Sequence, residues 1–186
     1  MKKKEKEKNT PDTPPFEFVE AEVRQKTFGI LSTIDQDGKS HSTGILYAIS
    51  PPGSKFSLYI LTDRSYKKVR NVQHNSSVSV VIPFPHHLLR FVPSSCVQFQ
   101  GTAKILSYED SEAQQAFKMG KRMLTMNLEQ AIEEDPTGEN IVFIKIIPNQ
   151  KIFCYGLGIS LMQLRKDVEI GSYSVIIPKE RYAEQK

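Results

Sequence analysis

Apolar residues are first spaced at helical intervals along the chain, and the spacing then changes to that of strands. Phe16, Val19 and Val23 predict a short helix over 16–26. Strand-like runs separated by turn residues follow, and we predict strands at 28–34, 40–49, 55–62 and 77–83. Asp37-Gly38 lies between the first two runs and is a strong hairpin signal, so these two strands are expected to be antiparallel neighbours.

The period changes again within this series of strands. Val69 and Val72 are three residues apart among basic residues, which predicts a short amphipathic helix over 65–74. A longer helical stretch is predicted over 109–134, with a break near Gly120. Further strands are predicted at 96–106, 141–147, 151–155 and 173–177, and a short helix at 159–165. This order indicates a mainly β fold, a six-stranded antiparallel split β-barrel with peripheral helices.

The net charge of +4 is concentrated at the N-terminus. Residues 1–8 hold five Lys and two Glu, or +3, so the remaining chain carries only +1. We expect residues 1–15 to be a disordered basic, proline-rich tail and residues 16–186 to form a single domain. A nearly neutral domain lacks the basic surface that attracts nucleic acid, so binding of nucleic acid is not expected. The alternative is a nucleic-acid-binding module that acts through the lysine-rich tail. The chain has no long apolar run and no secretory signal, which predicts a cytoplasmic protein without a membrane span.

Cysteine, histidine and methionine give no metal or catalytic motif. Cys96 and Cys154 lack metal-ligand spacing, so we predict buried free thiols, with a long-range disulfide as the alternative. His86 and His87 are adjacent in a loop and would point apart, so no metal site is predicted. The spacing of three methionines predicts packing in the core or at a dimer contact: Met119, Met123 and Met126.

The informative stretch is the strand end and helix start from Leu61 to Lys68. A helix N-terminus offers unpaired amides and a positive dipole end, which favour an anion. Ser65 or Asp63 is suited to cap this helix. Cations in a first turn cost a helix roughly 0.3–1 kcal/mol each, and a bound dianion would reverse that sign. Lys67 and Lys68 therefore indicate a phosphate ligand, the alternative being a solvated basic face.

The succession of these segments resembles the pyridoxamine 5′-phosphate oxidase-like family of FMN-binding split barrels. The resemblance rests on Phe28–Ile34, Asp37-Gly38, the 40–47 strand, Tyr59–Thr62, Ser65–Val72 and Val78–Val81, and it covers residues 26–106. It implies that the flavin ring lies against Thr43, Gly44, Ile45, Leu46, Leu61 and Thr62. It also implies phosphate contacts from Lys67 and Lys68 with Ser65 nearby, and a homodimer with two flavins at the subunit interface, each site completed by the second chain.

Departures from the family narrow this expectation. Pyridoxamine phosphate oxidases proper have an Arg at Thr43, a Lys at Ala48 and a Gln at Cys96, and their C-terminal motif contains a Trp that this chain lacks. Oxidation of vitamin B6 is therefore not expected. The expected function is that of an FMN-binding, flavin-dependent oxidoreductase of unknown substrate, with no catalytic residue identified. The alternatives are an F420-type deazaflavin oxidoreductase in the same barrel and a non-catalytic flavin- or haem-binding sensor.

Overall fold

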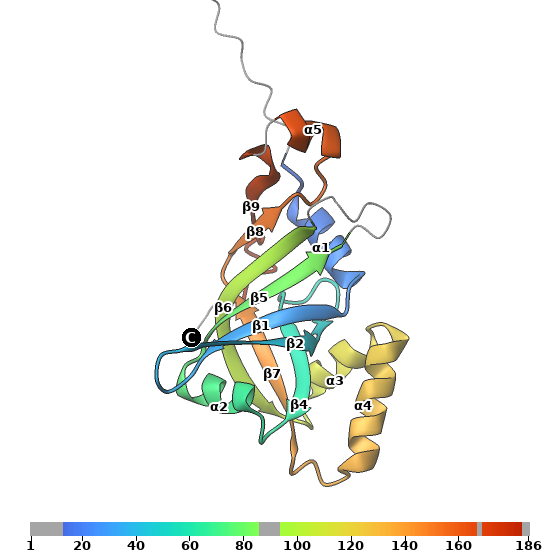
Figure 1. Cartoon of the computed structure of the whole chain (residues 1–186). Helices are drawn as coiled ribbons and strands as arrows, with labels where there is room; N and C mark the ends of the chain where they lie inside the picture. The colour runs from blue at the N-terminus through green and yellow to red at the C-terminus, as the bar shows by residue number, and fades with distance from the viewer. Residues whose placement is uncertain (1–12, 86–93, 167–168, 184–186) are drawn as a thin grey trace, which may run out of the picture.

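A curled antiparallel sheet forms the centre of the molecule (Figure 1). The structure is a computed structural model, and it describes residues 13–85, 94–166 and 169–183. The strands are β1 (Phe28–Ile34), β2 (Ser40–Leu46), β3 (Ala48–Ile49), β4 (Leu58–Asp63), β5 (Ser77–Phe84), β6 (Ser95–Ser107), β7 (Ile141–Pro148), β8 (Lys151–Tyr155) and β9 (Ser172–Ile176). Residues 1–12 of the predicted tail, and both His86 and His87, lie outside the described residues.

The two ends of the sheet approach one another, which produces the predicted split barrel. The strand order is β2-β1-β5-β6-β7-β4-β3, and residues of β2 lie close to β4. The described part of the chain holds nine strands, so the predicted number of six is wrong. One reason is that the predicted 40–49 strand changes its partner at Tyr47, because Leu46 pairs with Phe28 of β1 whereas Ala48 pairs with Tyr59 of β4. The other is that β8 and β9 form a hairpin beyond the main path of the sheet.

Five α-helices and a short 3-10 helix surround the described part of the sheet. They are α1 (Phe16–Arg24), α2 (Lys67–His74), α3 (Ser111–Lys118), α4 (Arg122–Glu134), α5 (Leu161–Lys166) and η1 (Glu169–Gly171). The predicted break near Gly120 is confirmed, and a Cβ at that position would lie 2.8 Å from Cδ1 of Leu124. None of the helices in the described ranges is apolar over a length that would cross a bilayer.

Two hydrophobic clusters lie on opposite sides of β4. The larger cluster fills the barrel interior and includes Leu58 and Ile60. The smaller cluster lies under α3 and α4 and includes Tyr59, Phe117 and Leu128. Since side chains alternate along a strand, β4 sends one set of residues into each cluster. Figure 1 shows α3 and α4 beside the end of the barrel where β4 and β7 pair.

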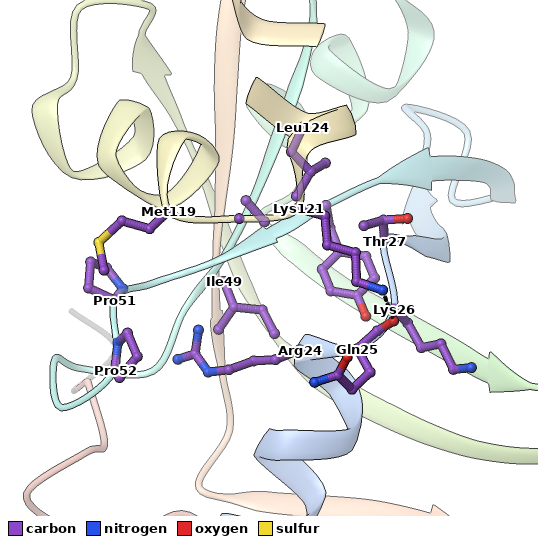
Figure 2. A pocket seen from close by; sticks show the side chains of 13 residues that line it. Arg24, Gln25, Lys26, Thr27, Ile49, Pro51, Pro52, Met119, Lys121 and Leu124 are labelled. Carbon is purple, nitrogen blue, oxygen red and sulfur yellow. Dashed lines mark hydrogen bonds between the residues drawn. The ribbon is translucent and has the colours of Figure 1, made fainter. Parts of the chain in front are cut away.

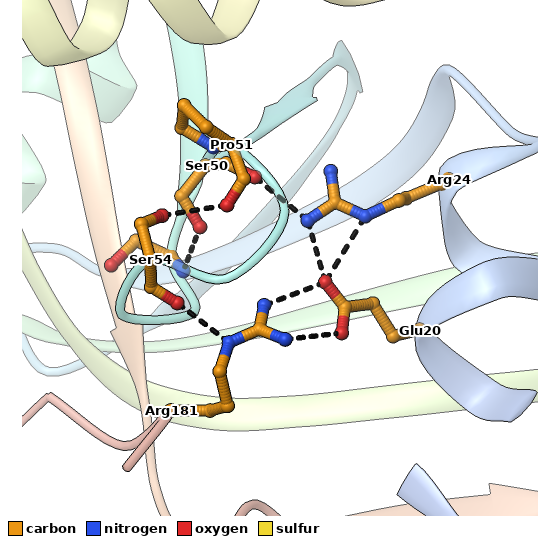
Figure 3. A network of polar contacts seen from close by, with 7 residues as sticks. Glu20, Arg24, Ser50, Pro51, Ser54 and Arg181 are labelled. Atoms are coloured by element: carbon orange, nitrogen blue, oxygen red, sulfur yellow. Dashed lines mark hydrogen bonds and ion pairs between the residues drawn. The ribbon is translucent and has the colours of Figure 1, made fainter. Parts of the chain in front are cut away.

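A buried carboxylate joins α1 to the C-terminal segment (Figure 3). Glu20 is 7% exposed and accepts hydrogen bonds from Arg24 at 2.5 and 3.0 Å and from Arg181 at 2.8 and 3.0 Å. Both arginines also donate to carbonyls of the turn between β3 and β4. Burial alone would raise the pKa of Glu20, but the hydrogen bonds and charges of Arg181 and Arg24 outweigh it and lower the pKa.

Replacing Arg181 with alanine is expected to lower the free energy of unfolding at pH 7 by about 2–3 kcal/mol, because a buried carboxylate loses one of its two cations. Urea denaturation measures this loss of stability. Lys179→Ala, which removes a nearby exposed cation, is the control. Because the folded-state pKa of Glu20 is lowered, Glu20 contributes to the free energy of unfolding at pH values above its ordinary pKa of 4.5. This contribution is lost as the pH falls through the lowered pKa. The difference in the free energy of unfolding between Arg181→Ala and Lys179→Ala should therefore become smaller in acid. Equal stability at pH 7 would contradict a stabilising role for Arg181.

Candidate functional site

The free edge of β2 carries part of the predicted site. Hydrogen-bonded and non-bonded residue pairs alternate along an antiparallel ladder. The amide of Tyr47 donates to Thr27 and that of Asp35 to Lys39, both at 2.9 Å, and the register between them is continuous. This alternation pairs the backbone groups of Thr43 and Ile45 with β1. It directs those of Gly44 and Leu46 away from β1, where a ligand can reach them.

The side chains of these residues divide between the two faces of the barrel. Ile45 is 5% exposed and belongs to the interior cluster, and Thr43, which pairs with Leu31, is half-buried on the same face of β2. Leu46 of β2 and Leu61 of β4 face outward and both pack against the cluster under α3 and α4. A Cβ at Gly44 would lie 3.0 Å from the ring of Phe28, so a larger residue here would require this half-exposed ring to shift.

A groove of about 500 Å³ lies where β4 ends and α2 begins. Its walls also come from the C-terminal half of α4 and the start of β7. Three of the predicted site residues line it: Leu61, Thr62 and Lys68. The volume is in the range of ordinary small-molecule sites. The structure therefore brings Leu61 and Thr62, which were predicted to contact the flavin ring, together with Lys68, which was predicted to contact the phosphate.

The start of α2 differs from the prediction in its cap. Tyr66, not Ser65 or Asp63, is the N-cap residue, and no side chain caps the described helix. The reason is that a carboxylate oxygen of Asp63 accepts hydrogen bonds from the amide of Ser65 at 2.6 Å and its hydroxyl at 2.5 Å. This closes a turn before the helix begins. The first amides of α2 thus keep their capacity for an anion, while the Ser65 hydroxyl already has an acceptor.

The two predicted phosphate lysines have different surroundings. Lys67 pairs with Asp35 of the β1–β2 turn at 3.1 Å. Lys68 lines the groove, where its ammonium lies 5.1 Å from the centre of the Tyr66 ring and where burial lowers its pKa. No ion pair is found for Lys68 within the described ranges. Of the two, Lys68 is the cation available to a ligand.

Thr62 is a buried polar group that lacks a hydrogen-bond partner. It is 7% exposed, it lines the groove, and its Oγ1 has no hydrogen-bond partner among the described residues. Because side chains alternate along β4, Thr62 points with Leu58 and Ile60 toward the barrel interior, so its hydroxyl lies on the face of the strand opposite to Leu61. Thr33, on β1, is the contrasting case, because its hydroxyl accepts from Asn71 at 2.8 Å and donates to the carbonyl of His41 at 3.3 Å.

Replacing each threonine with valine tests this difference in the ligand-free protein. Thr62→Val should leave the free energy of unfolding unchanged or slightly higher, because it removes a hydroxyl that has no partner. Thr33→Val should lower it by about 1–3 kcal/mol, because it leaves the Asn71 amide buried without an acceptor. Urea denaturation measures both values. Equal destabilisation would mean that Thr62 also has a partner in the protein itself.

A second, basic cleft of about 300 Å³ lies at the opposite end of α4 (Figure 2). Arg24, Lys26 and Lys121 line it, and none of its lining residues is acidic. Lys121 donates to the carbonyl of Gln25 at 2.5 Å. The sequence analysis missed this cleft because its cations come from segments nearly a hundred residues apart, and no local pattern joins them.

The two cysteines are free thiols, which excludes the disulfide alternative. Cys96 pairs with Tyr155 and Val97 with Cys154, so the two thiols point to opposite faces of the sheet. Cys154 is buried as predicted, and burial raises its pKa to about 11. Cys96 is only partly buried, because it lies on the outer face and lines a groove of about 400 Å³ with Gln98 and Phe153.

The predicted methionine stripe does not lie in the core. Met119, Met123 and Met126 are 58%, 47% and 57% exposed. Met119 ends α3, so it does not continue the helical face of Met123 and Met126 on α4. Packing of these methionines at a dimer contact stays a prediction.

Comparison with known proteins identifies the class to which this fold and site belong. The family model described as pyridoxamine 5′-phosphate oxidase matches residues 16–151, which is well over half of the chain. The protein therefore belongs to the pyridoxamine 5′-phosphate oxidase family. General stress protein 26 from Bacillus anthracis is 25% identical with a TM-score of 0.52, and the match covers 74% of this chain and 91% of that one.

Two more distant structures share the fold. A pyridoxamine 5′-phosphate oxidase-related, FMN-binding protein from Nostoc punctiforme is 12% identical, with a TM-score of 0.57 and coverage of 88% of this chain and 90% of that one. A haem storage protein from Vibrio cholerae is 16% identical, with a TM-score of 0.58 and coverage of 78% and 98%. No curated protein matches the chain.

Proposed function

We propose that this protein binds FMN in the groove at the start of α2 and acts as a flavin-dependent oxidoreductase. The observation that carries the proposal is the meeting, in one groove of about 500 Å³, of the uncapped start of α2 and the half-buried Lys68, for which no ion pair is found among the described residues. Each of these groups lacks a partner that a phosphorylated ligand supplies. Membership of the family and the FMN-binding relative from Nostoc punctiforme support flavin over other phosphorylated ligands.

The residues fit an FMN molecule placed along this face. The free backbone groups of Gly44 and Leu46 would hold the polar edge of the ring, and Leu61 would contact its apolar part. The first amides of α2 and the ammonium of Lys68 would hold the phosphate, with Ser65 and Lys67 outside the innermost contacts. When bound, FMN supplies the hydride and electron transfer, while the protein supplies position and electrostatics. The two free thiols are consistent with action in a reducing cytoplasm.

Loss of Lys68 is expected to weaken FMN binding by about tenfold or more and riboflavin binding by much less, since a hydrogen bond to a charged group contributes about 1.5–3 kcal/mol. Lys67→Ala is the matched control, and we expect an effect below about threefold because Lys67 pairs with Asp35 at an exposed site. Fluorescence titration with both flavins measures these values. Equal losses of FMN and riboflavin affinity in Lys68→Ala would show that the phosphate lies elsewhere.

The visible spectrum of the purified protein separates flavin from haem. A yellow protein that releases FMN on denaturation supports the proposal, and a haem spectrum would favour the sensor or storage alternative. A colourless protein that takes up neither added FMN nor haem would contradict both. Oxidation of a reduced nicotinamide cofactor by the FMN-loaded protein would distinguish an enzyme from a flavin carrier.

We propose that the protein is a homodimer formed through the outer face of the sheet. Ile30, Val81, Gln98 and Phe153 lie in one cross-strand row over β1, β5, β6 and β8. Ile30 and Phe153 are 38% and 40% exposed, and Phe28 and Ile176 on the same face are 50% and 55% exposed. Apolar patches of this kind on a sheet face are typical of protein interfaces.

A charge placed within this face should dissociate the dimer. Phe153→Asp is expected to sediment as a monomer, because dimerisation would bury an unpaired carboxylate. Met162→Asp is the control, since Met162 is 74% exposed on α5, away from the row. Analytical ultracentrifugation of the wild type and both variants measures the mass. A wild type that is monomeric at high concentration, or a Phe153→Asp variant that stays dimeric, would overturn this assignment.

The basic cleft suggests the class of redox substrate. Arg24 is paired with Glu20, which leaves Lys26 and Lys121 as the cations of the cleft, and no carboxylate lines it among the described residues, so its field favours an anionic molecule. The cleft and the flavin groove lie at the two ends of the same helix, α4. We therefore propose that the substrate is a small organic anion.

A further inference from the structure

Helix α4 has an outer face that exposes apolar side chains. Its inner face packs toward the sheet through Leu124 and Leu128, which are 3% and 1% exposed. Met123 and Met126, on the other side of the helix, are 47% and 57% exposed. The residues of the proposed sheet-face contact lie on β1, β5, β6 and β8, whereas α4 lies beside the end of the barrel where β4 and β7 pair (Figure 1). The outer face of α4 is therefore a separate surface.

The charges of α4 are divided between its two ends. Lys121 and Arg122 are exposed where the helix begins, and no acidic residue occupies the first turn. Glu129 and Glu133 are exposed in the second half, and no basic residue occupies the last turn. These charges oppose the helix dipole, and Glu129 and Glu133 repel one another because they are four residues apart. A partner with the opposite order of charges would relieve both effects.

One exposed face of α4 carries both kinds of charge with a methionine between them. Its residues recur at intervals of four, three and four positions, which is the spacing of one helix face: Arg122, Met126, Glu129 and Glu133. A second copy of α4, laid antiparallel on this face about a two-fold axis, places Arg122 of each copy opposite Glu133 of the other. The two Met126 side chains then meet beside the axis. The face is thus complementary to itself, with an apolar centre and opposite charges at its ends.

The two charges that end this face are available for such a contact. Within the described ranges, no ion pair is found for either Arg122 or Glu133. The charged groups that hold the fold together are paired, as Glu20 is with Arg181. Methionine side chains are flexible and adapt readily to a partner surface, which suits the centre of the face to a contact between copies.

We infer that α4 forms a second contact between copies of this chain, in which the helix pairs antiparallel with α4 of another copy. The pairing itself is independent of the proposed flavin site. It rests on the proposed homodimer for one consequence, which is that sheet-face dimers are joined into larger assemblies. A single pair of helices is small for a stable interface, so this contact is expected at higher protein concentrations than the sheet-face contact.

Charge reversal in the full chain tests the pairing by analytical ultracentrifugation over a range of concentrations. The wild type is expected to pass from dimers to larger assemblies as its concentration rises. Arg122→Glu and Glu133→Arg should each raise the dissociation constant of this step by about tenfold, because like charges then face one another across the axis. Arg165→Glu, at an exposed position on α5, is the matched control and should leave the step unchanged.

Restoring the complementarity gives the sharpest readout. An equimolar mixture of Arg122→Glu and Glu133→Arg should associate as the wild type does, because the two acidic positions of one variant face the two basic positions of the other. The double variant should also associate, since its charges are exchanged but still opposite. Raising the ionic strength should weaken the step, because the charges are exposed to solvent. Circular dichroism of each variant identifies any loss of folding.

The outcomes separate this contact from the proposed dimer. If the wild type forms dimers but Arg122→Glu associates further just as well, or if the mixture stays apart, the α4 pairing is wrong and the sheet-face dimer is unaffected. If Phe153→Asp stays dimeric and Arg122→Glu is a monomer, the α4 pairing holds and the sheet-face assignment fails. A wild type that is monomeric at every concentration overturns both. Binding to vesicles of anionic lipid without any self-association would assign the face to a membrane surface and overturn the pairing.

Discussion

Strand β4 is buried on both faces, whereas an antiparallel sheet commonly exposes one face to water. Leu58 and Ile60 pack in the barrel interior, and Tyr59 packs under α3 and α4. The strand is thus held from both sides, and its end leads within a few residues into α2. The position of the α2 start, the groove beside it and the nearby free edge of β2 all depend on this double burial.

The site proposed here combines groups whose placement weakens the protein in the absence of a ligand. Lys67 and Lys68 lie at the start of α2, and Glu134 lies at the end of α4. Charges at these ends oppose the helix dipoles, whereas the buried Glu20 is held between two arginines. The contrast favours a binding role for the groove.

Local patterns predicted much of the fold. β1 and β8 begin and end where strand and turn signals placed them, and the helix break at Gly120 was visible in the sequence. Long-range contacts account for the differences. The predicted 40–49 strand is divided at Tyr47 because the residues before it pair with β1 and those after it pair with β4. Strand β4 begins late because the amide of Phe56 donates to Arg181 at the other end of the chain.

The candidate site was predictable only in part, because local sequence patterns do not show long-range contacts. Leu61, Thr62 and Lys68 are close in sequence and meet in the groove, but the pairing of Lys67 with Asp35 depends on how α2 packs beside the β1–β2 turn. Glu134 lines the same groove but comes from α4, far along the chain, so only the folded chain brings it to the groove of Lys68. The basic cleft is assembled in the same way from distant segments.

The most direct test of the FMN assignment is a crystal structure of the protein with bound FMN. The account predicts that the phosphate accepts hydrogen bonds from the first amides of α2 and from the ammonium of Lys68, with the flavin ring along the free edge of β2 at Gly44 and Leu46. A phosphate found instead in the basic cleft beside Lys121, with the groove at the α2 start left without ligand, would contradict it.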